Sequence, residues 1–175
     1  PPVTRAGARD GDVVAVSGAL GAAAKGIADL FALATIDGEP DAALASALRA
    51  SSSDVRAQLQ PTPPIGDGVL AAIAGATSML DVSDGLVLDA RRIARASGVT
   101  IDLHAAEIGD QAALHGGEDH ALLATFPPNA VLPGGFRAVG VVGAAVNQPG
   151  VTVDGVADDA AGGWDPFAGW DGHSG

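Results

Sequence analysis

The sequence contains no cysteine and only one lysine, and each shortage excludes a class of function. Without cysteine the chain has no disulfide, no thiolate metal site and no cysteine nucleophile. The single lysine, Lys25, lies in an alanine-rich stretch and not in a glycine-rich loop. The motif G-x-x-x-x-G-K-[ST] is absent, which excludes a P-loop kinase of the usual kind.

Positive charge is also scarce, because nine Lys and Arg residues face 21 Asp and Glu, for a net charge of -12. Nucleic acids and anionic membranes are bound by clustered basic residues, so we expect neither as a partner, and any bound phosphate needs metal ions beside it. No apolar run approaches the roughly 18 to 20 residues of a membrane span. We therefore expect a soluble, cytoplasmic protein.

A length of 175 residues and a hydrophobic content of 47% are enough for one globular domain. The chain opens with two prolines and a valine, without methionine, and we expect it to continue something longer.

Residues 79–86 (MLDVSDGL) place polar side chains where an apolar run meets a long amphipathic pattern. Asp81 and Ser83 alternate with apolar residues at strand spacing, so both should share one face at the end of a strand. Asp84 follows as the expected N-cap of a helix. Two carboxylates and a hydroxyl beside the positive end of a helix suit a magnesium ion together with a phosphate. A capped helix in which Asp81 is merely hydrogen-bonded is the alternative.

Hydrophobic periodicity predicts strands and helices in alternation along the rest of the chain. Strands are predicted at 12–20, 99–103, 121–126, 136–142 and 151–153, and helices at 21–34, 41–49, 67–76 and 86–97. Residues 51–64 are rich in turn formers and are predicted as a linker, and residues 104–115 as irregular. This order favours an α/β (α+β) layered domain with a mixed β-sheet packed with helices.

Two glycine-rich stretches have open interpretations. Residues 17–21 (SGALG) join a strand to a helix, and we favour a tight turn over a phosphate-binding loop. In the acidic tail, Trp164 and Trp170 each occur within Gly-Trp-Asp, and a large aromatic in such a stretch needs a surface to pack on, either core or ligand. The four histidines show no metal-ligand spacing.

Taken together, the motifs resemble the thiamine-monophosphate kinase family of the PurM-like (AIR-synthetase-like) superfamily. The matching segments are residues 4–8 (TRAGA), 11–12 (GD), 17–21 (SGALG), 61–63 (PTP), 81–86 (DVSDGL), 116–119 (GGED) and 163–167 (GWDPF). The resemblance implies a PurM C-terminal-like domain at 1–155 and a Gly/Trp-containing tail at 156–175 that completes the substrate site. It also implies that the family's N-terminal domain, which makes most of the ATP site and the dimer interface, is absent from these residues.

The resemblance further implies a function, namely ATP- and Mg²⁺-dependent phosphorylation of thiamine monophosphate to thiamine diphosphate. The transfer would be direct and in line, with no catalytic residue that becomes phosphorylated, and this part of the enzyme would be inactive alone. Its partners would be the two small-molecule substrates and, through the missing half, a second copy in a homodimer. The implied roles are magnesium binding by Asp81 and Asp84, ATP binding by Arg5 and Ser83, and substrate binding by Glu118 and Trp164.

Three residues depart from the family's pattern, and other functions remain open. Pro64 stands where an arginine is usual, His120 where a tyrosine is usual, and Pro166 where a histidine is usual. The segment between residues 103 and 115 is also shorter than in the family. The alternatives are another PurM-like enzyme, of the aminoimidazole-ribotide or selenophosphate synthetase type, and a non-catalytic binding module. The GGED run with the aromatic tail speaks against the first of these.

Overall fold

The computed structural model describes residues 2–158. The tail predictions for Trp164 and Trp170 lie outside this range. The strands are β1 (Val13–Ser17), β2 (Thr35–Ile36), β3 (Glu39–Pro40), β4 (Ser78–Val82), β5 (Val99–Leu103), β6 (Ala121–Phe126), β7 (Arg137–Ala144), β8 (Gly150–Val153) and β9 (Val156–Ala157). The helices are α1 (Ala22–Leu33), α2 (Ala42–Ser51), α3 (Ser53–Leu59), α4 (Ile65–Ile73), α5 (Leu86–Ser97), α6 (Ala105–Ile108) and α7 (Gln111–His115). Within the described range, none of these helices has both the length and the apolar character needed to span a membrane.

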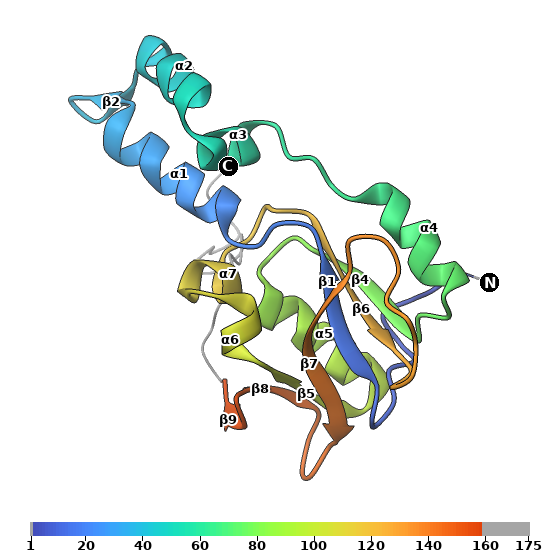
Figure 1. Ribbon diagram of the computed structural model, residues 1–175. Coiled ribbons are helices and arrows are strands. Elements are labelled where there is room, and N and C mark those ends of the chain that lie inside the picture. The colour runs from blue at the N-terminus through green and yellow to red at the C-terminus, as the bar shows by residue number, and fades with distance from the viewer. Residues whose placement is uncertain (1, 159–175) are drawn as a thin grey trace, which may run out of the picture.

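The centre of the molecule is a seven-stranded sheet with the order β4-β6-β1-β7-β5-β8-β9 (Figure 1). Strand β5 pairs in parallel with β8 and antiparallel with β7, so the sheet is mixed. The predicted α/β class with a mixed sheet packed with helices is therefore confirmed. The domain boundary at 155/156 stays a prediction, and β9 pairs with β8 just beyond it.

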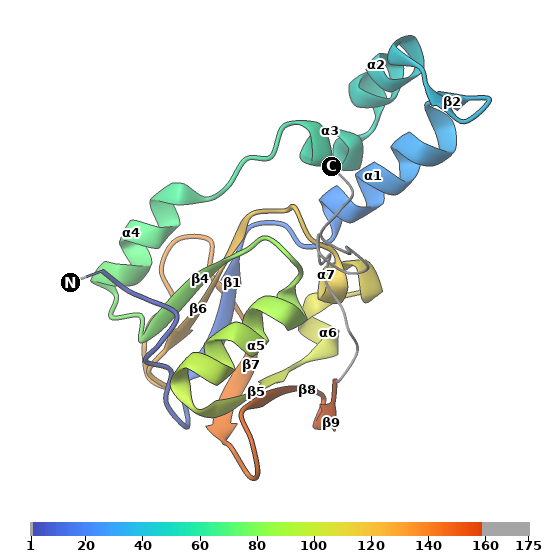
Figure 2. The same cartoon turned by 180° about the vertical axis from the view of Figure 1, so that it is seen from behind.

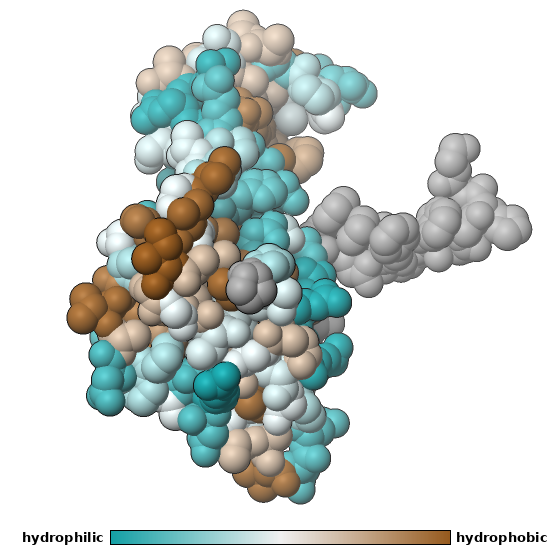
Figure 3. Space-filling view, turned by 90° about the vertical axis from the view of Figure 1, so that its right-hand side faces the viewer, coloured by the Kyte–Doolittle hydropathy of each residue, from teal (hydrophilic) through white to brown (hydrophobic). Residues whose placement is uncertain are grey.

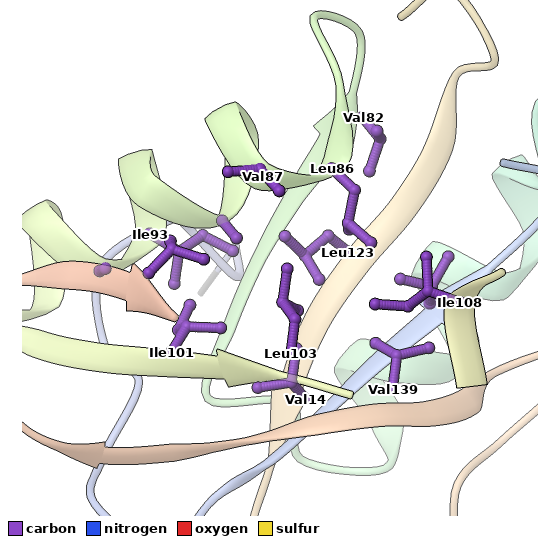
Figure 4. Close-up of a cluster of buried hydrophobic side chains, with 14 of the residues drawn as sticks. Val14, Val82, Leu86, Val87, Ile93, Ile101, Leu103, Ile108, Leu123 and Val139 are labelled. Atoms are coloured by element: carbon purple, nitrogen blue, oxygen red, sulfur yellow. The ribbon is translucent and has the colours of Figure 1, made fainter. Parts of the chain in front are cut away.

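Helix α5 covers one face of the sheet, as the view from behind shows (Figure 2). Its buried stripe follows the predicted period, with Leu86 and Ile93 lying toward strand residues such as Leu103 and Leu123 (Figure 4). Leu86, Ile93, Leu103 and Leu123 are fully buried, which makes this layer the main hydrophobic core. Gly98 ends the helix in a left-handed conformation, as expected for a glycine at this position.

The opposite face of the sheet is partly covered by α4 and the loop at 127–136. Here Phe126 and Phe136 pack edge to face, with ring centroids 5.3 Å apart. The outer side of α4 is apolar as well, because Ile65, Val69 and Ile73 are 76%, 62% and 79% exposed. Hydrophobic side chains accordingly gather on this side of the molecule (Figure 3).

Helices α1, α2 and α3 form an arm that projects from the sheet (Figures 1 and 2). The prediction of a linker over residues 51–64 was wrong, because α3 lies within it and buries Val55. Residues 104–115 are likewise not irregular but contain α6 and α7. In both cases a polar residue caps the helix: Ser52 accepts a hydrogen bond from the Val55 amide, and Asp110 accepts one from the Ala113 amide.

Candidate functional site

The junction between β4 and α5 presents the predicted polar side chains at the end of a strand. Asp81 is exposed on β4 opposite Leu122 of β6, while its neighbour Val82 is buried. The predicted helix cap was wrong, because the N-cap is Gly85 and it makes no side-chain cap bond. The Asp84 carboxylate instead forms an ion pair with Arg92, with 2.5 Å between Oδ2 and Nη2.

The side chain that holds this junction together is Asp89, which was not among the residues singled out from the sequence. Its carboxylate is fully buried and accepts hydrogen bonds from the backbone amides of Ser83 and Asp84, both at 3.0 Å. It also pairs with Arg92. Burial raises the pKa of Asp89 above its ordinary value, while the Asp84 amide and Arg92 act in the opposite direction. The sequence signal that could have identified Asp89 is a carboxylate at a core position of α5, where the other core positions are apolar.

A loop at residues 116–120 is fastened to the same junction. The Glu118 amide donates to the Ser83 carbonyl at 2.8 Å, and the His120 amide donates to the Val82 carbonyl at 3.1 Å. Glu118 and His120 both adopt left-handed conformations, with φ of 70° and 53°. Such conformations are uncommon for residues other than glycine and are often held in place at functional sites. The loop therefore has a fixed shape against the strand that carries Asp81.

Gly117 allows this loop to approach the junction closely. A Cβ atom at position 117 would lie 2.6 Å from the Ser83 carbonyl oxygen, which is closer than such atoms come in proteins. A side chain at this position would force the loop and the β4–α5 junction apart.

We therefore expect Gly117→Ala to lower the free energy of unfolding by about 1 to 3 kcal/mol, the usual cost of forcing extra atoms into a packed region. Gly66→Ala is the matched control, because nothing lies within 4 Å of a Cβ there. That change, in a helix, should be neutral or stabilising by up to about 1 kcal/mol. Urea unfolding of both variants measures the difference, and equal effects at the two positions would contradict this account.

Asp119 connects the loop to the start of the arm. Its carboxylate is buried and accepts hydrogen bonds from the Gly21 amide at 2.5 Å and the Ala23 amide at 2.8 Å. The first amides of α1 are thus satisfied by a carboxylate of the protein. This supports a tight turn, and not a phosphate-binding loop, at residues 17–21.

A hollow of about 610 Å³ opens beside the loop. Its lining residues are Ala24, Ile27, Gln58, His115, Gly117 and Glu118. They come from α1, α3, the end of α7 and the loop itself, so both the arm and the loop contribute to the walls. Ligand pockets commonly measure about 300 to 1,000 Å³, and this hollow is of that size.

Known proteins similar to this chain include several thiamine-monophosphate kinases, although no family model matches the chain. The chain is 42% identical, over 97% of its length, to the thiamine-monophosphate kinase of Mycobacterium tuberculosis and covers 49% of that protein. The chain is a homologue of the thiamine-monophosphate kinases. The resemblance seen in the sequence is thereby confirmed, and the chain spans about half the length of the kinases it matches.

Solved structures of thiamine-monophosphate kinases have the same fold. The crystal structure of the enzyme from Aquifex aeolicus matches 89% of the chain with a TM-score of 0.72 at 30% identity, and the chain covers 54% of it. AaThiL complexed with AMPPCP and TMP matches 94% of the chain with a TM-score of 0.75 at 30% identity, again over 54% of that protein. The shared part is thus one half of a kinase of this family.

In this thiamine-monophosphate kinase homologue the structure brings together four of the six predicted site residues. Asp81, Ser83 and Asp84 lie at the β4–α5 junction, and the Glu118 amide is bonded to that junction. Trp164 lies outside the described residues.

Arg5 is the predicted site residue that the fold places elsewhere. Its carbonyl oxygen accepts a hydrogen bond from Ser97 Oγ at 3.4 Å, and Ser97 is the last residue of α5. A helix of 12 residues is about 18 Å long, so the Arg5 backbone lies roughly that far from Asp84.

The carboxylates at the junction suit a metal ion that is shared with a phosphate group. Across residues 2–158 no group of three or more His, Cys, Asp or Glu side chains could hold a metal ion by itself. Asp81 accepts no hydrogen bond from the described residues, and Asp84 uses Oδ2 for Arg92. Magnesium is commonly bound by one or two protein carboxylates, with water and phosphate oxygens completing the shell. Asp81 and Asp84 match that pattern.

Proposed function

We propose that this chain is the C-terminal part of an ATP- and Mg²⁺-dependent thiamine-monophosphate kinase, which makes thiamine diphosphate. The observation that carries the proposal is the attachment of the loop at 116–120 to residues 82–83 through two backbone hydrogen bonds. Both segments belong to the motifs shared with the family, and together they place the carboxylates of Asp81 and Asp84 near a ligand-sized hollow. The names of the relatives, and AaThiL with its bound AMPPCP and TMP, support the same reaction.

Phosphoryl transfer requires alignment of the acceptor with the γ-phosphate and neutralisation of the negative charge that develops. A chain with a net charge of -12 has few side chains that could supply that charge. In this proposal Asp81 and Asp84 hold Mg²⁺, which supplies positive charge to the phosphate oxygens. The Ser83 hydroxyl binds ATP, and no side chain becomes phosphorylated.

The remaining contacts divide between the two substrates. Glu118, at the edge of the hollow, binds the thiamine part of the substrate, because a carboxylate would repel its phosphate. Trp164 packs on the same substrate. Arg5 binds ATP only at a point distant from Asp84, since α5 separates the two positions. The other half of the kinase completes the ATP site and forms the homodimer, and the protein acts in the cytoplasm.

A product assay on the full-length protein tests this function. With ATP, Mg²⁺ and thiamine monophosphate we expect thiamine diphosphate, detected by chromatography, and no product when EDTA removes the metal. Selenide and the substrate of the aminoimidazole-ribotide synthetases serve as competing acceptors. Turnover of one of these acceptors alone would contradict the proposal, and binding of thiamine monophosphate without turnover would indicate a binding module.

A further inference from the structure

Arg92 is the side chain that connects the buried interior of the β4–α5 junction to a candidate metal ligand. Its Nη1 atom pairs with the carboxylate of Asp89, and its Nη2 atom lies 2.5 Å from Oδ2 of Asp84. A guanidinium can contact two carboxylates in this way, because its N–H groups form a rigid, planar fork. Arg92 therefore holds two carboxylates at once, one fully buried and one partly exposed.

The buried end of this connection is fixed in place. The Asp89 side chain has no exposed surface and accepts hydrogen bonds from the amides of Ser83 and Asp84, both at 3.0 Å. Asp89 and Arg92 lie three positions apart on α5, so the helix places their side chains next to each other. Asp84 is consequently restrained twice, at its backbone amide by Asp89 and at its side chain by Arg92.

This restraint determines which oxygen atoms Asp84 can offer to a metal ion. Oδ2 is engaged by Arg92, whereas Oδ1 accepts no hydrogen bond from residues 2–158. A cation that shared Oδ2 would have to displace a guanidinium that is anchored to a buried carboxylate, and it would be repelled by the charge of that guanidinium. Asp84 can thus coordinate a metal ion with one oxygen but not with both.

Divalent cations differ in how much they use the second oxygen of a carboxylate. Mg²⁺ is small, requires a nearly octahedral shell and is commonly bound by one or two carboxylates together with water and phosphate oxygens. Ca²⁺ is larger, takes about six to eight oxygen ligands and uses carboxylates with one oxygen or with both. A rigid carboxylate that is limited to one oxygen therefore favours the smaller ion.

We propose that Arg92 favours Mg²⁺ over Ca²⁺ by restricting Asp84 to coordination through one oxygen. The inference rests on the proposed function, which places a metal ion at Asp81 and Asp84, and it assigns the ion selectivity of that site. Arg92 acts through Asp84 and is a positioning residue. Its positive charge weakens the binding of both ions alike, because the two ions carry the same charge. The ratio of the two affinities therefore reports the restriction of Asp84.

The test measures this ratio in the full-length protein. Mn²⁺ bound to the protein is followed by EPR spectroscopy and is displaced with Mg²⁺ or with Ca²⁺, so that two displacement curves give the two affinities. We expect Arg92→Met to lower the ratio of Mg²⁺ affinity to Ca²⁺ affinity about tenfold, the lower end of the usual effect of a residue that orients a metal ligand. Arg95→Met changes an exposed arginine of the same helix and should leave the ratio unchanged.

Two further variants separate the restriction of Asp84 from folding and from binding elsewhere. Arg92→Lys keeps the charge but has one nitrogen in place of the fork, so it cannot hold both carboxylates and should also lower the ratio. Melting temperatures identify any variant that fails to fold, and Arg92→Lys decides the result if Arg92→Met does not fold. An asparagine side chain has only one oxygen, so Arg92→Lys should leave the ratio unchanged in an Asp84→Asn background.

The failure of this inference can be distinguished from failure of the kinase function. An unchanged ratio in the Arg92 variants of a protein that phosphorylates thiamine monophosphate would overturn the inference and leave the function intact. A lowered ratio in a protein without turnover would support the inference and contradict the function. Displacement curves that Asp84→Asn does not alter would overturn the inference, and so would a lowered ratio that persists in the Asp84→Asn background.

Discussion

Replacement of Asp89 by alanine is expected to lower the free energy of unfolding by about 3 to 5 kcal/mol, because its buried carboxylate accepts two backbone hydrogen bonds and each bond to a charged group contributes about 1.5 to 3 kcal/mol. The change leaves the amides of Ser83 and Asp84 without their acceptor and Arg92 without one of its two carboxylates. Asp89→Asn keeps one acceptor oxygen and should cost less. Urea or guanidinium unfolding measures both.

Asp29→Ala is the control for this prediction, because Asp29 also lies on a helix but makes no hydrogen bond with the described residues. Its effect should stay within about 0.5 kcal/mol, as for most surface changes. A loss at Asp89 no larger than at Asp29 would show that the β4–α5 junction does not depend on the buried carboxylate.

The pH dependence of stability gives an independent check on Asp89. Its pKa in the folded protein is raised from the ordinary 3.8, so the folded state binds the proton more tightly than the unfolded state. The stability from this protonation is fully present below pH 3.8 and is lost as pH rises through the raised pKa. Asp89→Asn should lack this decrease, and unfolding measured across the acidic range would reveal it.

If the proposed function holds, Asp81→Asn is expected to reduce the Mg²⁺-dependent turnover of the full-length protein about a hundredfold or more, since a bound metal ion supplies several kcal/mol of charge stabilisation. The same change should alter the free energy of unfolding by no more than about 0.5 kcal/mol, because the side chain is exposed and accepts no hydrogen bond within the described chain. Turnover at several Mg²⁺ concentrations and thermal unfolding check the two halves of this prediction.

Asp84→Asn provides a useful contrast, because Asp84 is paired with Arg92 at a partly exposed position. It should lose turnover as well, together with up to about 1 kcal/mol of stability. Asp29→Asn should change neither quantity. An Asp81→Asn enzyme with unchanged turnover would mean that Asp81 is only a surface carboxylate at the end of β4.

The parts of the fold that could be predicted are those in which local pattern and tertiary packing agree. Strand β5 and helix α5 follow their hydrophobic periods because each buries one continuous face in the same core. Helix α3 was missed because Ser52 was interpreted as part of a linker. A serine can belong to a turn or to a helix cap, and the choice depends on whether the next residues are buried, as Val55 is here.

The same distinction between local and long-range contacts applies to the residues of the candidate site. Asp81, Ser83 and Asp84 could be placed together because they are close in sequence. The contacts of Asp119 could not be, since Gly21 is separated from it by 98 positions. Gln58 and His115 line the same hollow because α3 and α7 both approach the loop. No local sequence pattern encodes that approach. The family resemblance predicted Glu118 as a site residue, but it did not predict the residues that line the hollow beside it.

The capping of α1 by Asp119 has a consequence for how the hollow opens. Asp119 directly follows Glu118, so the loop cannot swing away from the arm without exposing the amides of Gly21 and Ala23. Opening would therefore require the loss of a helix cap, in addition to side-chain rotation. The walls of the hollow are in this sense preorganised, so substrate binding costs little free energy for ordering the loop.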